Sequence, residues 1–371
     1  MKILMISTDR GLLGKGQLGN VIERHKRYGE HVDRMDIIVF SRRGFSENRI
    51  SETVRAFPTN ARFPFAIPLR ALDIGKKLFI KHKYHLIVAQ DPLIAGWVGM
   101  KLKRIFGVKF LVHLHGDFID NRLWVRESFK NRFLRHLMPS VLSGSDAIRV
   151  MSRGQKEKLR RFVKKPVRVI ATPVDVNYFE NFRGGIRKDK KWNKAVLMVG
   201  RLDPVKDFGT LFAAMDIVFK KYEDCGLYLA GNYTRHEDVP LPSDKVVLCG
   251  QVAYTDLAEL YYSSDVVVLS SKSESFGKVL VEAGASLRPV VATETTGAKE
   301  IVRDKENGYL VPIGDAHTLA EKILKVLSDS ELAKRMGKRG RELAKERFSE
   351  EKSSEQIIRY WKDIIEDRIY E

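Results

Sequence analysis

The chain has 371 residues, of which 44% are hydrophobic and 30% charged, and its formal net charge is +19. This length exceeds what a single core holds comfortably, so two domains are expected, and the composition excludes a disordered protein. No apolar run approaches the ~20 residues that cross a bilayer, and the opening apolar stretch is too short for a secretory signal. Both cysteines, Cys225 and Cys249, lie in apolar segments, which indicates reduced thiols in a cytoplasmic protein.

The positive charge is confined to the N-terminal half. Residues 1–170 contain 35 Lys and Arg against 14 Asp and Glu, whereas the remainder is close to neutral. Such a surface attracts a polyanion, either nucleic acid or an anionic membrane face, although a salt- or heat-tolerant surface needs no partner. No nucleic-acid motif accompanies the charge, so membrane contact is favoured. Arg62–Arg70 and Lys101–Lys109 mix basic with apolar residues and are the candidate contacts, unless they are ordinary amphipathic stretches.

In the N-terminal half, short apolar runs alternate with helical segments, which predicts βαβ units and a mainly parallel sheet. Right-handed crossovers place the loops that follow the strands on one edge of the sheet. The expected strands are Lys2–Ser7, His31–Phe40, Thr53–Phe57, His85–Gln90, Lys109–His115, Asp146–Ser152 and Val167–Thr172. The helices between them include Leu69–Ile80, Leu93–Phe106 and Trp124–Leu142.

Residues 173–194 are polar and glycine-containing, which predicts a linker before a second α/β series. Its expected strands are Ala195–Gly200, Leu227–Gly231, Val246–Gly250, Val266–Ser271, Pro289–Thr293 and Tyr309–Val311. From about Asp315 the chain is helical to its end. The last segment, Ser353–Ile369, has an apolar stripe that includes Ile357, Trp361 and Ile364, so we expect it to return and pack on the first domain.

A glycine-rich segment follows the first strand: Gly14-Lys15-Gly16-Gln17-Leu18-Gly19. Glycines at this spacing let a backbone approach a phosphate or sugar closely. The segment begins seven residues after Ser7, too far for a dinucleotide fingerprint, so an NADP-type site is disfavoured. A flexible active-site loop is the preferred interpretation, and a plain solvent loop is the alternative.

Polar residues also close two strands of the N-terminal half. His113-Leu114-His115-Gly116-Asp117 ends one strand, and Asp91 follows the strand before it. Two histidines two residues apart share a face, but nothing else in the chain has matching metal-ligand spacing. We therefore expect His115 to be a hydrogen-bonding group at the sheet edge, or one part of a strand-end cap.

The clearest cluster lies in the second α/β series. Arg201 and Lys206 follow the apolar strand 195–200, and this pair of cations is suited to a diphosphate. Glu274 and Glu282 flank Gly277 at a helix start, whose backbone N–H groups favour an anion. Because carboxylates repel phosphate, the two glutamates are better explained as acceptors for sugar hydroxyls. Together the residues predict a nucleotide-sugar site.

With these motifs the chain resembles the retaining GT-B glycosyltransferases of family 4, most strongly over Val196–Ile313. The segments that carry the resemblance are Glu274-Ser275-Phe276-Gly277 with Glu282-Ala283, Arg288-Pro289-Val290-Val291-Ala292, Gly297-Ala298-x-Glu300-Ile301-Val302 and Asn307-Gly308-Tyr309-Leu310-Val311. The resemblance implies two Rossmann-like domains that face each other across a cleft. Residues 1–172, with a returning helix at 350–371, would bind the acceptor, and residues 173–349 would bind a UDP- or GDP-sugar.

The resemblance also implies individual roles. Arg201 and Lys206 would bind the diphosphate and stabilise the leaving group, Glu282 would accept from the ribose hydroxyls, and Glu274 would contact the donor sugar. Further donor contacts would come from the loop glycine Gly16, from the backbone at Val252, and from the helix start at Phe276, Gly277, Lys278 and Val279. His115 would lie near the transferred sugar, and the acceptor side would include Gly14, Asp91 and Asp117.

Two departures from the family pattern affect the acceptor side. The usual double glycine is interrupted as Gly14-Lys15-Gly16, and the segment before the second domain is shortened to Thr172-Pro173-Val174-Asp175. The family is described as retaining by a front-face route, and the sequence offers no Asp-x-Asp, so no metal or other cofactor is expected. A lipid-linked or glycan acceptor at the inner membrane face is expected. The alternatives are a sugar-nucleotide epimerase of similar fold and a basic protein that binds nucleic acid or another polyanion.

Overall fold

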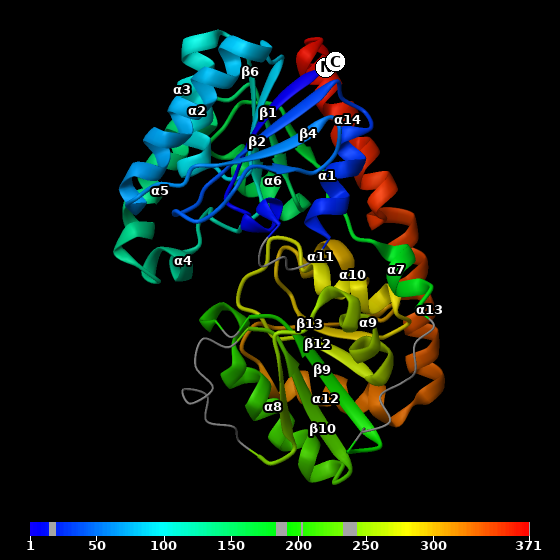
Figure 1. Cartoon of the computed structure of the whole chain (residues 1–371). Helices are drawn as coiled ribbons and strands as arrows, with labels where there is room; N and C mark the ends of the chain where they lie inside the picture. Colours follow the sequence, from blue (N-terminus) through cyan, green and yellow to red (C-terminus); the bar gives the residue numbers. More distant parts are fainter. Residues whose placement is uncertain (15–19, 183–190, 202, 233–242, 371) are drawn as a thin grey trace. The chain divides into compact units, whose positions relative to one another are not determined.

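The computed structural model describes residues 1–14, 20–182, 191–201, 203–232 and 243–370. The chain divides into an N-terminal unit, Met1–Ala171 with Ser353–Glu371, and a C-terminal unit, Thr172–Lys352 (Figure 1). Each unit is a mainly parallel sheet with helices on both faces, which confirms the predicted fold class. The predicted boundaries, after residues 172 and 349, lie close to these divisions.

The sheet of the N-terminal unit has the strand order β3-β4-β2-β1-β5-β6-β7-β8. All neighbouring pairs are parallel except β3 with β4. Its strands are β1 (Lys2–Ser7), β2 (Arg34–Val39), β3 (Asn48–Arg49), β4 (Val54–Pro58), β5 (Leu86–Ala89), β6 (Lys109–Leu114), β7 (Ala147–Val150) and β8 (Val167–Val169). The chain reverses direction across the sheet between β1 and β5, which creates a topological switch point there.

Helices cover both faces of this sheet (Figure 1). Side chains of α1 and α14 pack in the core on one face, and those of α2, α3, α5 and α6 pack in the core on the other. The helices are α1 (Val21–Gly29), α2 (Ile67–His82), α3 (Ile94–Phe106), α4 (Arg122–Arg126), α5 (Phe129–Gly144), α6 (Arg153–Arg160) and α14 (Glu350–Ile365), with short 3-10 turns η1 (Arg10–Leu13), η2 (Pro64–Ala66) and η5 (Arg368–Tyr370).

The predicted single helix Trp124–Leu142 is wrong, because the chain breaks between α4 and α5. Ser128 has an extended backbone, and its hydroxyl accepts a hydrogen bond from the Asn131 N–H at 3.1 Å. A serine in this position is a favourable N-cap, so it begins a new helix rather than continuing the old one. This break leaves α4 as a separate short helix beside α5.

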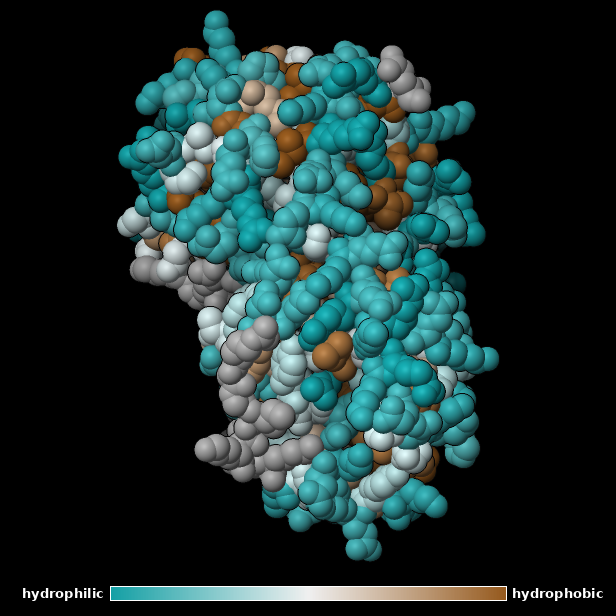
Figure 2. Space-filling model, turned by 90° about the vertical axis from the view of Figure 1, so that its right-hand side faces the viewer, coloured by the Kyte–Doolittle hydropathy of each residue, from teal (hydrophilic) through white to brown (hydrophobic). Residues whose placement is uncertain are grey.

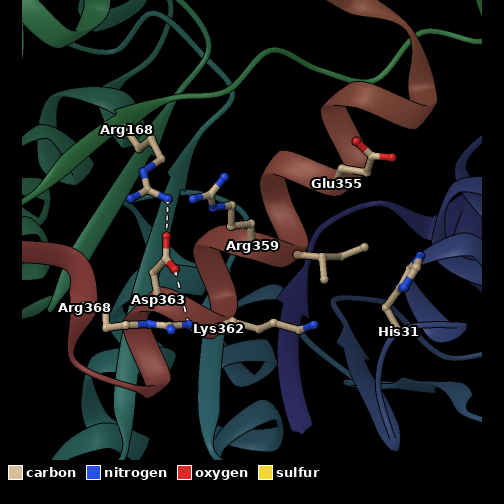
Figure 3. A pocket seen from close by; sticks show the side chains of 8 residues that line it. His31, Arg168, Glu355, Arg359, Lys362, Asp363 and Arg368 are labelled. Carbon is tan, nitrogen blue, oxygen red and sulfur yellow. Dashed lines mark hydrogen bonds and ion pairs between the residues drawn. The ribbon is translucent and has the colours of Figure 1, made fainter. Parts of the chain in front are cut away.

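The last helix packs on the N-terminal unit, as its apolar stripe predicts. Trp361 and Ile364 are fully buried, and the Trp361 ring meets the Tyr28 ring edge-on at 5.4 Å between centroids. At the surface, Asp363 of α14 accepts from Arg168 at 2.7 Å (Figure 3). Burial of one large aromatic side chain contributes on the order of 2–3 kcal/mol, so this stripe is a substantial part of the unit's core.

The C-terminal unit contains a six-stranded parallel sheet in the order β11-β10-β9-β12-β13-β14. Its strands are β9 (Lys194–Val199), β10 (Cys225–Ala230), β11 (Val246–Gly250), β12 (Val266–Leu269), β13 (Val290–Thr293) and β14 (Gly308–Val311). Its helices are α7 (Val176–Glu180), η3 (Pro204–Lys206), α8 (Phe208–Lys221), α9 (Tyr254–Ser263), α10 (Lys278–Ala285), α11 (Ala298–Ile301), α12 (Ala316–Ser328) and α13 (Ser330–Phe348). Side chains of α8, α12 and α13 form the core on one face.

Part of the predicted linker is ordered structure of the C-terminal unit. Asp175 caps α7 by accepting from the Tyr178 N–H at 3.0 Å, and Phe179 is fully buried against Tyr261. This helix was not predicted from the sequence, because the segment as a whole is polar and only two of the helix residues are buried. The glycines of the predicted linker, Gly184 and Gly185, lie outside the described residues.

In the view of Figure 2, hydrophobic residues appear in small groups among hydrophilic ones. Across the described residues, no helix is long and apolar enough to span a membrane. Cys225 is buried in β10 and Cys249 is half-buried in β11, and both are thiols rather than disulfide partners.

Candidate active site

The predicted donor residues lie at the carboxyl edge of the C-terminal sheet. Arg201 and Lys206 follow β9, and Glu274 follows β12, which is the neighbour of β9 in the sheet. The chain leaves β9 toward β10 and returns through β12 on the other side, so the two loops meet at a topological switch point. Open parallel sheets bind their ligands at this position.

Lys206 and Glu274 are brought together by this topology. The Lys206 ammonium forms an ion pair with the Glu274 Oε1 atom, and both side chains are mostly buried. The Ser271 hydroxyl donates to the same carboxylate oxygen at 2.9 Å, and the Ser270 hydroxyl donates to the Lys206 carbonyl at 2.8 Å. The loops after β9 and β12 are therefore fastened to each other, which fixes one cation and one carboxylate at the sheet edge.

Arg201 stands apart from this pair. Its side chain is 81% exposed, and its nearest carboxylate is Asp203, at 3.5 Å. An exposed guanidinium with one weak partner can reorient without breaking the fold. The structure thus places Arg201 at the correct edge but does not bring it into contact with Lys206.

The glutamate loop is held by two glycines. Gly277 begins α10 with a φ of +86°, a left-handed conformation that other residues adopt only with strain. Gly297 donates its N–H to the Glu274 carbonyl at 2.9 Å, and a Cβ atom there would lie 2.5 Å from the Phe276 nitrogen. These constraints place the N–H groups of Gly277, Lys278 and Val279 in the first turn of α10, where the helix dipole favours negative charge.

Glu282 lies one turn further along α10 and is buried. Its Oε1 atom lies 3.0 Å from the Lys278 ammonium, and its Oε2 atom accepts from the Tyr261 hydroxyl at 2.8 Å. Burial and the nearby carboxylate raise the pKa of Tyr261, so its hydroxyl stays a donor. Lys278 also lies over the Tyr254 ring at 4.8 Å. An ionised carboxylate can accept about four hydrogen bonds, so Glu282 keeps acceptor capacity, but Lys278 has to move to expose it.

Val252 lies in the segment between β11 and α9. It lines a hollow of about 490 Å³ together with Cys249 and Asp256. None of the predicted diphosphate, ribose or sugar contacts lines this hollow, so the backbone contact of Val252 with a base stays a prediction.

In the N-terminal unit, His115 is joined to a residue that sequence reasoning missed. The Gln90 amide oxygen, directly after β5, accepts from Nε2 of His115 at 2.6 Å and lies 3.3 Å from Nδ1 of His113. Arg149 of β7 approaches the same Nδ1 atom at 3.4 Å and donates to the carbonyls of Ile170 and Ala171 at 3.0 and 2.7 Å. Three neighbouring strands thus contribute one buried polar cluster.

This cluster carries a positive charge, and two of its members, His113 and Arg149, are buried. Burial and the Arg149 charge lower the pKa of both His113 and His115 well below the usual value, so both imidazoles are neutral near pH 7. Burial also lowers the pKa of Arg149 to about 10, which leaves the guanidinium charged. A neutral histidine whose N–H is donated to an amide oxygen is not a general acid at this pH, and its other ring nitrogen can only accept a hydrogen bond.

The other acceptor-side predictions have structural partners. Asp91 accepts from the N–H groups of Leu93 and Ala95 at 2.8 and 3.2 Å, as a cap at the start of α3, and burial raises its pKa. Asp117 accepts from Lys158 at 3.0 and 3.1 Å. Gly14 ends η1 with a φ of +77°, whereas Gly16 lies outside the described residues.

Sequence signals for the missed residues were present but weak. Arg149 is a charged residue within an otherwise apolar strand, and Gln90 directly follows a strand. Either feature could have indicated a functional polar residue at the sheet edge. Tyr261 and Ser271 had no signal, because their roles depend on contacts between elements. Within the described ranges, no group of three or more histidines, cysteines or carboxylates could hold a metal ion.

Comparisons with known proteins identify the family of the chain. The model for Glycosyltransferase Family 4 matches residues 26–178, and the model for Glycosyl transferases group 1 matches residues 180–343. An uncharacterized glycosyltransferase of Methanocaldococcus jannaschii is 28% identical over 364 residues, which is 95% of each chain. The phosphatidyl-myo-inositol mannosyltransferase of Mycobacterium leprae is 33% identical over 179 residues, 46% of this chain and 47% of that one.

Solved structures share the whole fold. The sucrose-phosphate synthase of Thermosynechococcus elongatus has a TM-score of 0.83 at 23% identity and covers 99% of this chain and 100% of its own. Anabaena HepE in complex with UDP-glucose has a TM-score of 0.76 at 21% identity and covers 98% and 100%. The fold is therefore that of a GT-B glycosyltransferase. With both halves matched by family models, the chain belongs to family 4 of the glycosyltransferases.

Proposed function

We propose that this enzyme transfers a hexose, with retention of configuration, from a UDP- or GDP-sugar to a hydroxyl of a lipid-linked or glycan acceptor. The observation that carries this proposal is the Lys206–Glu274 pair at the switch point of the C-terminal sheet. A cation and a carboxylate are fixed side by side there, with the first turn of α10 next to them in sequence. A diphosphate joined to a sugar needs this alternation of positive and hydroxyl-accepting groups.

Donor binding follows from the charges. Lys206 and Arg201 neutralise the diphosphate, and the N–H groups at the start of α10 add to that field. The diphosphate competes with Glu274 for Lys206, and a displaced Glu274 carboxylate is then available to the sugar hydroxyls. Glu282 accepts from the ribose hydroxyls once Lys278 has turned toward the phosphate. The structural neighbour HepE, which was solved with UDP-glucose, supports this class of donor.

The reaction breaks the bond between the anomeric carbon and the β-phosphate oxygen and forms a bond to the acceptor oxygen. The acceptor hydroxyl loses its proton to the departing diphosphate, so no protein carboxylate need act as a nucleophile. Lys206 and Arg201 stabilise the charge that develops on the leaving group, which is the main electrostatic contribution. Neutral His115 donates its one N–H to Gln90, so toward the transferred sugar its Nδ1 atom can only accept a hydrogen bond. None of these steps calls for a metal ion.

The acceptor side rests on the basic N-terminal unit. Its charge favours an anionic surface, and the relative from Mycobacterium leprae is named for a lipid acceptor. We therefore assign the enzyme to the cytoplasmic face of a membrane as a peripheral protein. Nucleic acid is the disfavoured partner, because no recognition motif accompanies the charge.

A panel of UDP-, GDP- and ADP-sugars tests the donor assignment by thermal shift, since a ligand that binds only the native state raises stability. We expect the sugar nucleotides of one base to raise the melting temperature of the native enzyme. No sugar nucleotide should raise the melting temperature of Lys206→Ala. Equal shifts in both proteins would contradict the assigned donor site.

Product analysis without an added acceptor separates this activity from epimerisation. Without an acceptor, a transferase releases at most a little sugar by slow hydrolysis of the donor. An epimerase instead releases an isomerised sugar with the nucleoside diphosphate. Accumulation of the epimer would favour the epimerase.

A further inference from the structure

Two hollows among the described residues of the N-terminal unit are lined by cations and differ in character. One lies beside α14, has a volume of about 550 Å³ and is lined by His31, four Arg and Lys, Glu355, Asp363 and a single aliphatic residue, Ile358 (Figure 3). In it, Asp363 lies between Arg168 and Arg368, so part of the positive charge is already neutralised. The other, which we name the α4–α6 groove, lies between α4, α5 and α6 and is about 1020 Å³.

The α4–α6 groove combines an apolar floor with a basic rim. Its floor consists of aliphatic side chains and one proline: Ile119, Val125, Met138, Pro139, Leu142, Leu159 and Val163. Its rim carries Arg122, Arg126, Arg132 and Arg135 with His136, against a single carboxylate, Asp120. A floor of this kind excludes water from a hydrocarbon chain, and guanidinium groups suit a phosphate.

The four rim arginines keep their charge available. No ion pair with a carboxylate is formed by any of them among the described residues, unlike Lys103 and Lys158 of the same unit, which bind Asp146 and Asp117. Arg132 instead lies over the Phe129 ring at 5.4 Å from the centroid. Several unpaired arginines on one groove repel each other, and an anion in the groove removes that repulsion.

Large aromatic side chains stand exposed beside the rim. Phe129 and Phe133, one turn apart on α5, are 85% and 76% exposed, and Phe162 at the end of the groove is 64% exposed. Exposing three phenylalanines to water is unfavourable unless they enter an apolar phase. Aromatic residues interleaved with arginines fit the interface of a bilayer with anionic headgroups.

The groove also lies next to the predicted acceptor residues. Asp117 precedes the lining residues Phe118 and Ile119 directly, and His115 lies two residues further back at the end of β6. The polar end of a molecule bound in the groove would therefore lie beside the segment that carries His115 and Asp117.

We propose that the α4–α6 groove binds a lipid phosphate, with the hydrocarbon chain on the apolar floor and the phosphate held by the rim arginines. One part of this inference rests on the proposed transferase function: the lipid is assigned as the acceptor or as the carrier of the acceptor. Binding of the lipid itself does not require the donor site.

Vesicle sedimentation with the full chain tests the proposal. We expect the protein to bind phosphatidylcholine vesicles that contain 20 mol% phosphatidic acid at least tenfold more tightly than phosphatidylcholine vesicles alone. Arg132→Glu/Arg135→Glu should lower that binding at least tenfold. Phe133→Ser/Phe162→Ser, which keeps the charge and removes only exposed side chains, should lower it about fivefold.

The hollow beside α14 supplies the matched control. Arg359→Glu/Lys362→Glu changes the net charge of the same unit by the same amount, and we expect less than a twofold change in vesicle binding. Circular dichroism of each variant verifies its fold. A loss equal to that of the rim variant would overturn the proposal, because it would show attraction by net charge alone.

Soluble anions and donor binding complete the test. Inorganic phosphate and pyrophosphate at 1 mM-scale concentrations should not displace the protein from the vesicles, and effective displacement would show a free-phosphate site instead. Thermal shift by the sugar nucleotide should be the same in the rim variant as in the native enzyme. If the native enzyme binds vesicles as expected but no sugar nucleotide raises its melting temperature, the transferase assignment is contradicted and the lipid-binding groove is not. If a sugar nucleotide raises the melting temperature but the enzyme does not bind the anionic vesicles, the lipid-binding groove is contradicted.

Discussion

The two units share one kind of sheet but arrange their charges differently. The C-terminal unit has 28 basic and 28 acidic residues, whereas the N-terminal unit has 38 basic and 19 acidic ones. At the carboxyl edge of the C-terminal sheet two lysines are paired with glutamates, as Lys206–Glu274 and Lys278–Glu282, while Arg201 is mostly exposed. At the corresponding edge of the N-terminal sheet, the buried Arg149 donates to two backbone carbonyls and approaches His113, and it forms no ion pair with a carboxylate among the described residues.

This difference indicates two ways of preparing a site for an anionic ligand. Paired charges hold each side chain in place and offer a sugar nucleotide both a cation and a carboxylate. Binding then requires that the ion pair be broken, which lowers the net binding free energy. Unpaired cations maintain a standing field that attracts an anion from a distance and is weakened by salt. The C-terminal arrangement suits recognition of one small molecule, and the N-terminal arrangement suits contact with a charged surface.

The largest expected effect comes from breaking the donor-site pair. Lys206→Ala removes the cation that we propose to stabilise the leaving diphosphate, and it leaves Glu274 uncompensated, so kcat/KM should fall by about 10²–10³, or about 3–4 kcal/mol of transition-state stabilisation. Initial rates with radiolabelled donor measure this loss. Lys299→Ala, which breaks the exposed pair with Glu294, is the matched control and should change the rate less than threefold. Equal rates for Lys206→Ala and the native enzyme would remove the donor assignment.

A second test concerns the buried cationic core of the N-terminal unit. His25 of α1 interacts electrostatically with His113 and His115, and burial and the Arg24 charge lower its pKa to about 3. The unfolded chain takes up the proton below about pH 6.5, so the native state loses stability as the pH falls through that value toward 3. Between pH 6.5 and 5 this single group should cost the unit about 2 kcal/mol.

His25→Gln removes the titrating group while keeping a donor for the Val21 carbonyl, which His25 Nδ1 contacts at 2.7 Å. Its unfolding free energy should therefore depend less steeply on pH than that of the native protein, although it is less stable at pH 7.5. Denaturant titrations followed by Trp361 fluorescence are suitable, because Trp361 contacts Tyr28, which in turn contacts His25. Parallel pH curves for the two proteins would contradict the lowered pKa.

The sequence predicted which residues of the C-terminal candidate site lie together more completely than it did for the N-terminal cluster, for a physical reason. The donor residues follow the strand pattern directly, with Gly277 between two glutamates on one loop and helix, so local spacing carries most of the information. The cluster of Gln90, His115 and Arg149 joins the ends of three strands, and its contacts arise only when the sheet forms.

The α4–α6 groove was invisible in the sequence for another reason. Phe129 and Phe133 have the spacing of a buried helical face, and the predicted continuous helix gave no cause to expect them at the surface. The break at Ser128 separates α4 from α5, and only then does a hollow between them exist. Apolar periodicity predicts a face of a helix but not whether protein or another phase covers it.

The smallest expected effect separates site geometry from stability. Gly277→Ala and Gly314→Ala both place a side chain at a left-handed position, with φ of +86° and +83°, so each should lose about 1–2 kcal/mol of stability. At Gly314 a Cβ atom meets nothing within 4 Å, whereas at Gly277 it lies 3.3 Å from Leu280 at the start of α10. Because Gly277 sets the position of the first-turn N–H groups, only Gly277→Ala should also weaken the thermal shift by the donor, by several-fold in apparent affinity. Equal donor affinity in both variants would mean that the α10 turn contributes to the fold of the C-terminal unit and not to its ligand.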